Sequence, residues 1–164
     1  MSNLVTSTQV KTVVTAVSAF DKSYFDTSIQ WIEDSLICGI LTLPLYTDLL
    51  LQLATPPLSA AYQTLYDKVV TAESYAVAFE AYEKDLENKI ANQGVMDNHT
   101  QWSKSASKSS AKKSIGVIKS REVFYCEALC TFLIEDSEKT IPDYPLFDTD
   151  LAYYKPELRG FFPL

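Results

Sequence analysis

The stretch that decides the fold is Leu58 to Ile90, which reads LSAAYQTLYDKVVTAESYAVAFEAYEKDLENKI. Its apolar residues recur at alternating intervals of three and four, the spacing of one face of an α-helix. The pattern predicts one long central helix of about thirty residues, on the order of 50 Å at 1.5 Å per residue, and the longest element of the chain. Only Glu83 breaks the pattern. The apolar positions are Leu65, Val69, Ala72, Ala76, Phe79, Leu86 and Ile90.

Shorter helices are expected before this stretch. Thr6 and Gln9 have the spacing of a capping box, so a helix should begin there. A second helix is expected to start at Asp26 or Ser28 and to close near Gly39.

A third helix should begin at Thr42, because Pro44 follows two residues later and proline is tolerated in a first helical turn. The run Thr55-Pro56-Pro57 should end it, since proline cannot continue a helix.

After the long stretch, one more helix is predicted from about Ser105 to Ile134, with Ser103 or Ser105 as its cap. Gly116 should be its weakest point, costing about 1 kcal/mol relative to Ala. The residues expected to be buried are Ile115, Ile118, Phe124, Tyr125, Leu129, Phe132 and Leu133.

Composition agrees with one all-α domain. The chain has 164 residues, 47% of them apolar and 21% charged, and only four are Gly. We expect a helical bundle over residues 1–139, with a basic insert at 92–114, followed by an arm at 140–164. The three cysteines (Cys38, Cys126 and Cys130) fit reduced thiols rather than a disulfide framework. The N-terminus does not read as a secretory signal, and the apolar window at 36–53 reads as a buried helix pair rather than a membrane span.

Charge is unevenly distributed along the chain. Residues 98–121 contain six basic residues and no Asp or Glu, whereas the rest holds 8 basic and 21 acidic residues. Such segregation indicates a site that faces negative charge, either DNA phosphates or the acidic body of a neighbouring subunit. A solvated lysine face is the alternative. The basic residues are Lys104, Lys108, Lys112, Lys113, Lys119 and Arg121.

Before the basic run, the sequence predicts a projecting loop or hairpin. Gly94 should end the long helix, because glycine tolerates the left-handed conformation that helix ends favour. Val95 and Met96 could then extend as a strand or hairpin arm, and Trp102 is assigned to the same loop.

The last 25 residues form the C-terminal arm, which is expected to be extended. Residues 140–164 hold four of the seven prolines, which forbid a long helix. Its aromatic residues need cover, on the chain's own body or on a neighbouring protein, and we expect the neighbour in the assembled state. They are Tyr144, Phe147, Tyr153, Tyr154, Phe161 and Phe162.

The sequence does not read as an enzyme. It has a single histidine, His99, and no Gly-rich phosphate loop, so no constellation for nucleophilic or phosphoryl chemistry is found. No cofactor is expected. Cys126 and Cys130 are four residues apart and could supply half of a metal site, but small buried residues are the simpler reading, so no metal is expected.

Three further segments carry a resemblance to a known family. The first runs from Ile29 to Leu50 and includes Leu43-Pro44-Leu45-Tyr46. The second is the Asn92-Gln93-Gly94-Val95 step, and the third is Phe132-Leu133 with the tail at 144–147. The chain resembles the head-to-tail connector (head completion or adaptor) proteins of tailed bacteriophages, in the versions of phages of Bacteroidetes hosts, including the crAss-like group. Thr42 stands where that pattern has Gly.

This resemblance implies a structural virion protein without catalytic activity. Such proteins form a homo-oligomeric ring, commonly dodecameric, between the portal protein and the tail or further connector proteins. DNA passes through the lumen and is contacted without sequence preference. The resemblance also implies assembly in the bacterial host cytoplasm, a place in the virion neck, and no membrane contact. The alternative is a small cytosolic helical adaptor or regulator that binds an acidic partner or nucleic acid through the basic insert.

Overall fold

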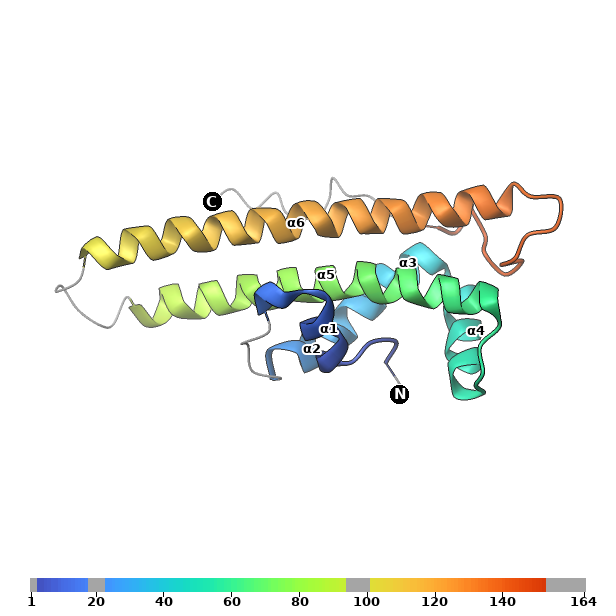
Figure 1. The fold of residues 1–164 in the computed structure, drawn as a ribbon, viewed down its shortest axis with the longest axis horizontal. Coiled ribbons are helices and arrows are strands. Elements are labelled where there is room, and N and C mark those ends of the chain that lie inside the picture. The colour runs from blue at the N-terminus through green and yellow to red at the C-terminus, as the bar shows by residue number, and fades with distance from the viewer. Residues whose placement is uncertain (1–2, 18–22, 94–100, 153–164) are drawn as a thin grey trace.

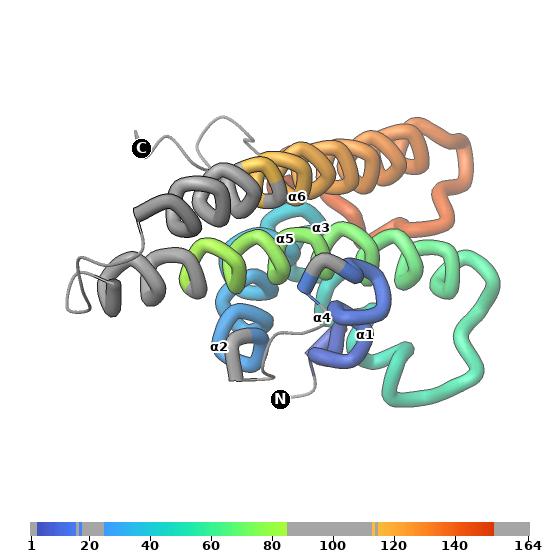
Figure 2. Tube along the Cα trace, turned by 60° about the vertical axis from the view of Figure 1, so that its left-hand side comes forward, coloured from blue at the N-terminus to red at the C-terminus, as the bar shows by residue number. Residues whose placement is uncertain are grey.

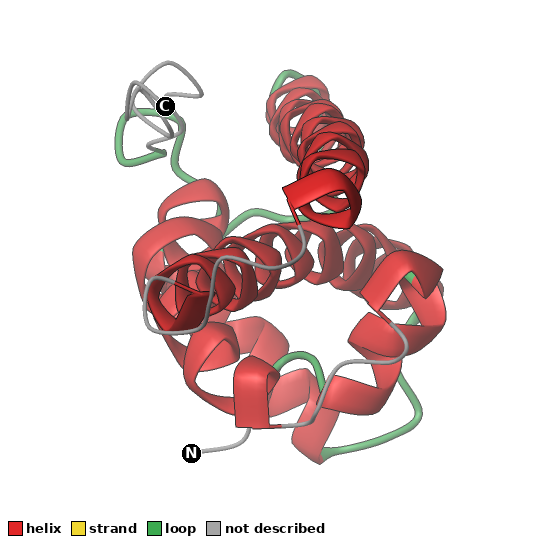
Figure 3. Cartoon of the chain, turned by 90° about the vertical axis from the view of Figure 1, so that its left-hand side faces the viewer, coloured by secondary structure: helices red, strands yellow, loops and turns green. Residues whose placement is uncertain are grey.

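A computed structural model describes residues 3–17, 23–93 and 101–152 of the chain (Figure 1). Within these residues the secondary structure is helical, with no strand (Figure 3). The all-α class predicted from the sequence is therefore confirmed. The helices in order are α1 (Ser7–Val13), η1 (Thr15–Val17), α2 (Ser23–Ile32), η2 (Glu33–Ile37), α3 (Cys38–Leu41), α4 (Leu43–Ala54), α5 (Ala60–Gln93) and α6 (Gln101–Ser137).

Helix α5 lies at the centre of the molecule. Helix α6 runs back along one side of it, and α1, α2 and α4 lie on the other side (Figure 1). The turned view shows the same pairing of the two long helices (Figure 2). Every predicted apolar position of α5 from Leu65 to Phe79 is buried, because α5 is covered from both sides. The central helix is confirmed, but α6 has 37 residues against 34 in α5, so α5 is not the longest element.

The first helix begins as predicted. Thr6 caps α1, its hydroxyl accepting from the backbone N–H of Gln9 at 3.3 Å, and the Gln9 side chain accepts from the N–H of Thr6 at 2.9 Å. Gln9 also donates to the hydroxyl of Tyr66 on α5 at 3.0 Å. The capping box thus ties α1 to the central helix as well as starting it.

The second predicted helix is built from three segments. Helix α2 starts at Ser23, earlier than the expected caps Asp26 and Ser28, and continues through the π-helix η2 into α3. Gly39 lies within α3 rather than at its end. π-Helical turns are rare in proteins, and those that occur are often found at functional sites. We therefore consider the first residue of this turn, Glu33, as a candidate functional residue.

The predicted start at Thr42 and the stop at Thr55 are both confirmed, since Thr42 is the N-cap of α4 and Thr55 its C-cap. Thr42 does not cap with its side chain. Its backbone has φ 65°, a conformation that favours glycine, and its hydroxyl is buried without a hydrogen-bond partner among the described residues.

Replacing Thr42 by Gly should therefore stabilise the fold. The substitution relieves the positive φ and removes the unpartnered hydroxyl, while the greater freedom of glycine in the unfolded chain offsets part of the gain. The expected net increase in the free energy of unfolding is about 1 kcal/mol. Urea unfolding measures it. Thr42→Ala serves as the control, because alanine removes the hydroxyl but not the backbone strain, and Gly no better than Ala would contradict the strain.

Helix α6 turns most of the predicted positions to the core, with one exception. Ile118, Leu129 and Leu133 are buried as predicted, but Phe124 is 62% exposed, so its predicted burial is wrong. At about 100° per residue, Phe124 is turned roughly 120° from Ile118. The inner positions are instead shared with Glu122 and Cys126.

Within the described residues, no single helix is long and apolar enough to cross a membrane. The pair Phe25–Leu41 and Leu43–Ala54 passes that test together, but it is bent by 111°.

Candidate interaction surfaces

The basic segment is mostly helix rather than a projecting insert. Helix α6 begins at Gln101, four residues before the predicted Ser105, and therefore includes Trp102, which had been assigned to the loop. Gly94, Val95 and Met96 lie outside the described residues. All six basic residues belong to α6, although the side chains of Lys104, Lys108 and Lys112 fall outside the described part.

The three basic residues with described side chains differ in their surroundings. Lys113 and Arg121 are exposed, whereas Lys119 is half-buried with its ammonium 5.7 Å from the ring centre of Phe79 on α5. Arg121 donates to the hydroxyl of Tyr75 at 3.0 Å. The basic residues thus occupy more than one side of α6, because residues four apart drift by about 40° around a helix.

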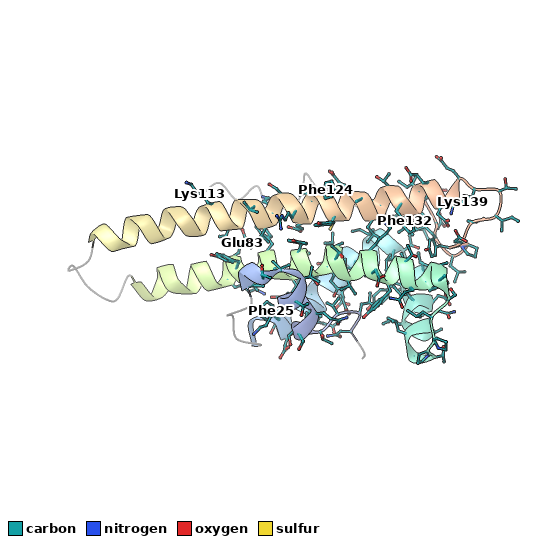
Figure 4. All side chains as sticks on the ribbon, viewed as in Figure 1. Phe25, Glu83, Lys113, Phe124, Phe132 and Lys139 are labelled. Carbon is teal, nitrogen blue, oxygen red and sulfur yellow. The ribbon has the colours of Figure 1, made fainter. Side chains whose placement is uncertain are left out.

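Two hollows lie along the same side of α6. One has a volume of about 270 Å³ and lies between α1, α5 and α6, with Lys113, Val117 and Arg121 on its α6 wall. The other has about 410 Å³ and lies beside the second half of α6, between Phe124, Phe132 and Lys68 of α5. Figure 4 shows Lys113 and Phe124 along α6.

The first part of the C-terminal arm packs on the chain's own body, which corrects the expectation of a neighbour for Tyr144 and Phe147. Both residues are buried. The Tyr144 hydroxyl donates to the carbonyl of Ala61 at 2.7 Å, and its ring lies 5.9 Å from that of Tyr62 and 5.6 Å from that of Phe132. Tyr153, Tyr154, Phe161 and Phe162 lie outside the described residues, so for them the expectation stays a prediction.

Asp136, at the end of α6, holds this turn in place. Its carboxylate is almost completely buried and accepts from the backbone N–H groups of Tyr144 at 2.9 Å and Asp143 at 3.2 Å, and from the ammonium of Lys139 at 2.7 Å. Burial alone would raise the pKa of Asp136, but the bonds from Lys139, Tyr144 and Asp143 outweigh it and lower the pKa. The turn is therefore held by an ionised carboxylate, a feature that sequence spacing does not reveal.

Large apolar side chains are exposed on several parts of the molecule, and two of these parts are α4 and α6. On α4, Leu43 is 64% and Leu51 is 63% exposed, eight residues apart and thus on one side of the helix. On α6, Val117 is 55% and Phe124 is 62% exposed, seven residues apart. Since α4 and α6 lie on opposite sides of α5, these are two distinct surfaces (Figure 1).

A pair of carboxylic acids is buried between η2 and α5. Glu33 is 1% exposed, and it accepts from the backbone N–H of Leu4 at 2.5 Å and from the Tyr46 hydroxyl at 3.3 Å. Glu73 is fully buried beside it, and neither of its oxygens has a well-formed hydrogen bond among the described residues.

Burial is the largest influence on both groups. It raises the pKa of Glu33 against the opposing bonds from Leu4, Glu73, Tyr46 and Val5. It raises the pKa of Glu73 well above the usual range, and the neighbouring charge of Glu33 raises it further. Burial beside Glu33 therefore favours the protonated form of Glu73.

This pair has neither the access nor the ligands of a reactive centre. Neither residue lines the hollows beside α6. Among the described residues, no group of three or more His, Cys, Asp or Glu side chains is placed to hold a metal ion. The carboxyl pair instead links the N-terminal segment, through Leu4, to the two helices beneath it.

Comparison of the chain with protein-family models, curated proteins and solved structures finds no match. The function is therefore inferred from the chain's own residues.

Proposed function

We propose that the chain is a structural subunit of a ring that connects the portal to the tail of a bacteriophage, with DNA passing through its lumen. The observation that carries the proposal is the pair of separate exposed apolar surfaces on α4 and α6. A cyclic ring joins each copy to two neighbours through two different patches, whereas a simple dimer needs only one. Exposed leucines and phenylalanine on opposite sides of α5 meet this requirement.

The uneven charge supports the DNA part of the proposal. Residues 101–121 of α6 belong to the acid-free run, while the acidic residues of that helix, such as Glu127 and Glu135, come after it. A ring built from such subunits can turn its basic segments to the lumen and keep its acidic body outside. Phosphate contacts of this kind are independent of DNA sequence and weaken as salt rises.

Replacing Lys104, Lys108 and Lys112 together by Glu tests this assignment. Lys113 is left in place because it is exposed beside a separate hollow. We expect the ring to form and DNA retention to fall, because each lost phosphate contact removes about one unit from the salt slope of binding. Ring formation is followed by electron microscopy, and DNA retention by a filter assay over a salt series.

Two other outcomes have distinct meanings. Loss of the ring itself would place the lysines at a contact between subunits rather than in the lumen. Unchanged assembly and unchanged DNA retention would contradict any role for the basic segment. Triple replacement of Asp26, Asp67 and Asp150 by Asn is the control for a change of several charges, because these three residues are exposed and lie outside α6.

The alternative function, a small regulator, makes a different prediction for the free chain. A regulator would be a monomer or dimer that shifts to a larger species only when nucleic acid is added. The two exposed apolar surfaces favour the ring, since a regulator that binds through its basic segment does not explain the exposed leucines of α4.

A further inference from the structure

The exposed side of α6 carries a stripe of residues spaced three or four apart. Every residue of the stripe is exposed, and every one lines one of the two hollows beside α6. At 1.5 Å per residue the stripe is about 33 Å long. Its members are Lys113, Val117, Arg121, Phe124, Ala128, Thr131 and Glu135.

The stripe is complementary to itself when reversed. Phe124 lies at its centre, with Lys113 eleven residues before it and Glu135 eleven residues after it. Val117 and Thr131 are likewise each seven residues from Phe124. A second copy laid antiparallel would therefore place Lys113 against Glu135, Val117 against Thr131, and Phe124 against its own equivalent.

The charged ends of the stripe are available for such contacts. Lys113 and Glu135 form no salt bridge with any described residue. Arg121 and Glu127 continue the same division, with positive charge before Phe124 and negative charge after it. A parallel arrangement would instead bring like charges together, which is unfavourable.

We infer that two copies of this chain associate through a two-fold, antiparallel contact of their α6 stripes, with the Phe124 side chains at the axis. A closed two-fold contact uses the same patch on both copies, which a self-complementary stripe provides. The contact uses Val117 and Phe124, which the proposed ring also uses, so one copy makes either the two-fold contact or the ring contact. The free chain forms the dimer, and ring assembly replaces it. Because one helix pair buries less than about 1,200 Å², we expect a dissociation constant in the micromolar range.

Single cysteines on the stripe test the geometry in the full chain. A disulfide needs Cα atoms within about 7 Å, so Phe124→Cys, at the axis, should cross-link to itself under mild oxidation. Val117→Cys and Thr131→Cys should each fail to cross-link alone and should cross-link when mixed. Thiol blocking of the unsubstituted chain sets the background from the three native cysteines, of which Cys126 is buried.

Charge reversal tests the energetics by sedimentation velocity. Lys113→Glu and Glu135→Lys should each weaken the dimer by at least about tenfold, because each places like charges in contact twice. The double variant restores the opposite charges and should return the dissociation constant to near that of the unsubstituted chain. Both positions are exposed, and circular dichroism checks that each variant is folded.

Three results would overturn the inference. The first is self-cross-linking of Val117→Cys and Thr131→Cys as strong as that of Phe124→Cys. The second is a double charge variant whose dimer dissociates as readily as the dimers of the single variants. The third is a dimer whose dissociation constant is unchanged by both single reversals. A failure of this kind leaves the ring proposal standing, because the ring is detected separately by particle size. Dimers that form no ring even when a portal is added would contradict the ring proposal and support the contact.

Discussion

Replacing Glu73 by Gln should raise the stability of the folded chain at neutral and alkaline pH and flatten its pH dependence. The pKa of Glu73 is raised well above the value of 4.5 that applies in the unfolded chain. The folded state therefore binds a proton that the unfolded state releases. The stability that the protonated Glu73 contributes is fully present below pH 4.5, and it falls as the pH rises above that value.

The measurement is the urea midpoint between about pH 5 and pH 8, a range in which the unfolded carboxyl is ionised. The unsubstituted chain should lose stability across this range, and Glu73→Gln should lose much less. Burial also raises the pKa of Glu33, so a smaller fall of the same sign should remain. Glu127→Gln, at an exposed position, is the matched control. If the urea midpoint fell equally with pH in all three chains, Glu73 would not have a raised pKa in the folded state.

Two truncations should separate folding from assembly. Ending the chain after Lys139 removes Tyr144 and Phe147, whose burial stabilises the fold by about 1.5–3 kcal/mol each, and also the Tyr144 bond to Ala61. The expected loss is therefore several kcal/mol, which thermal unfolding would measure.

Ending the chain after Ala152 keeps these contacts and removes residues 153–164 alone. We expect this chain to melt close to the full-length protein and to fail in assembly, because the remaining aromatic residues of the arm are predicted to cover a neighbour. If the chain that ends after Ala152 assembled like the full chain, the prediction for the arm would be wrong. If the chain that ends after Lys139 melted at the same temperature as the full chain, the turn held by Asp136 would not stabilise the body.

The sequence predicts those parts of the fold that depend on local signals. The capping box at Thr6, the start at Thr42 and the stop at Thr55 each rest on residues close in sequence, and all three are confirmed. The predicted start of α6 is four residues late, because the several serines of this segment are equivalent candidate caps. The π-helical turn at Glu33 has no such signal.

The missed features depend on contacts distant in sequence. Tyr144 is buried because its hydroxyl donates to the carbonyl of Ala61 and its backbone N–H donates to Asp136. The spacing of apolar residues in the sequence does not predict either hydrogen bond. Glu73 reads as a solvated charge on a helix, yet it is buried because α5 is covered on both sides. Phe124 reads as core and is exposed, which is why the self-complementary stripe on α6 was not predicted.

The most direct test of the central claim is the mass and shape of the purified chain, measured by mass photometry and negative-stain electron microscopy at increasing protein concentration. The ring proposal predicts closed ring particles of one defined copy number, alone or on addition of a portal. A chain that stays monomeric or dimeric at every concentration, forms no ring on a portal, and changes size only when nucleic acid is added would contradict it.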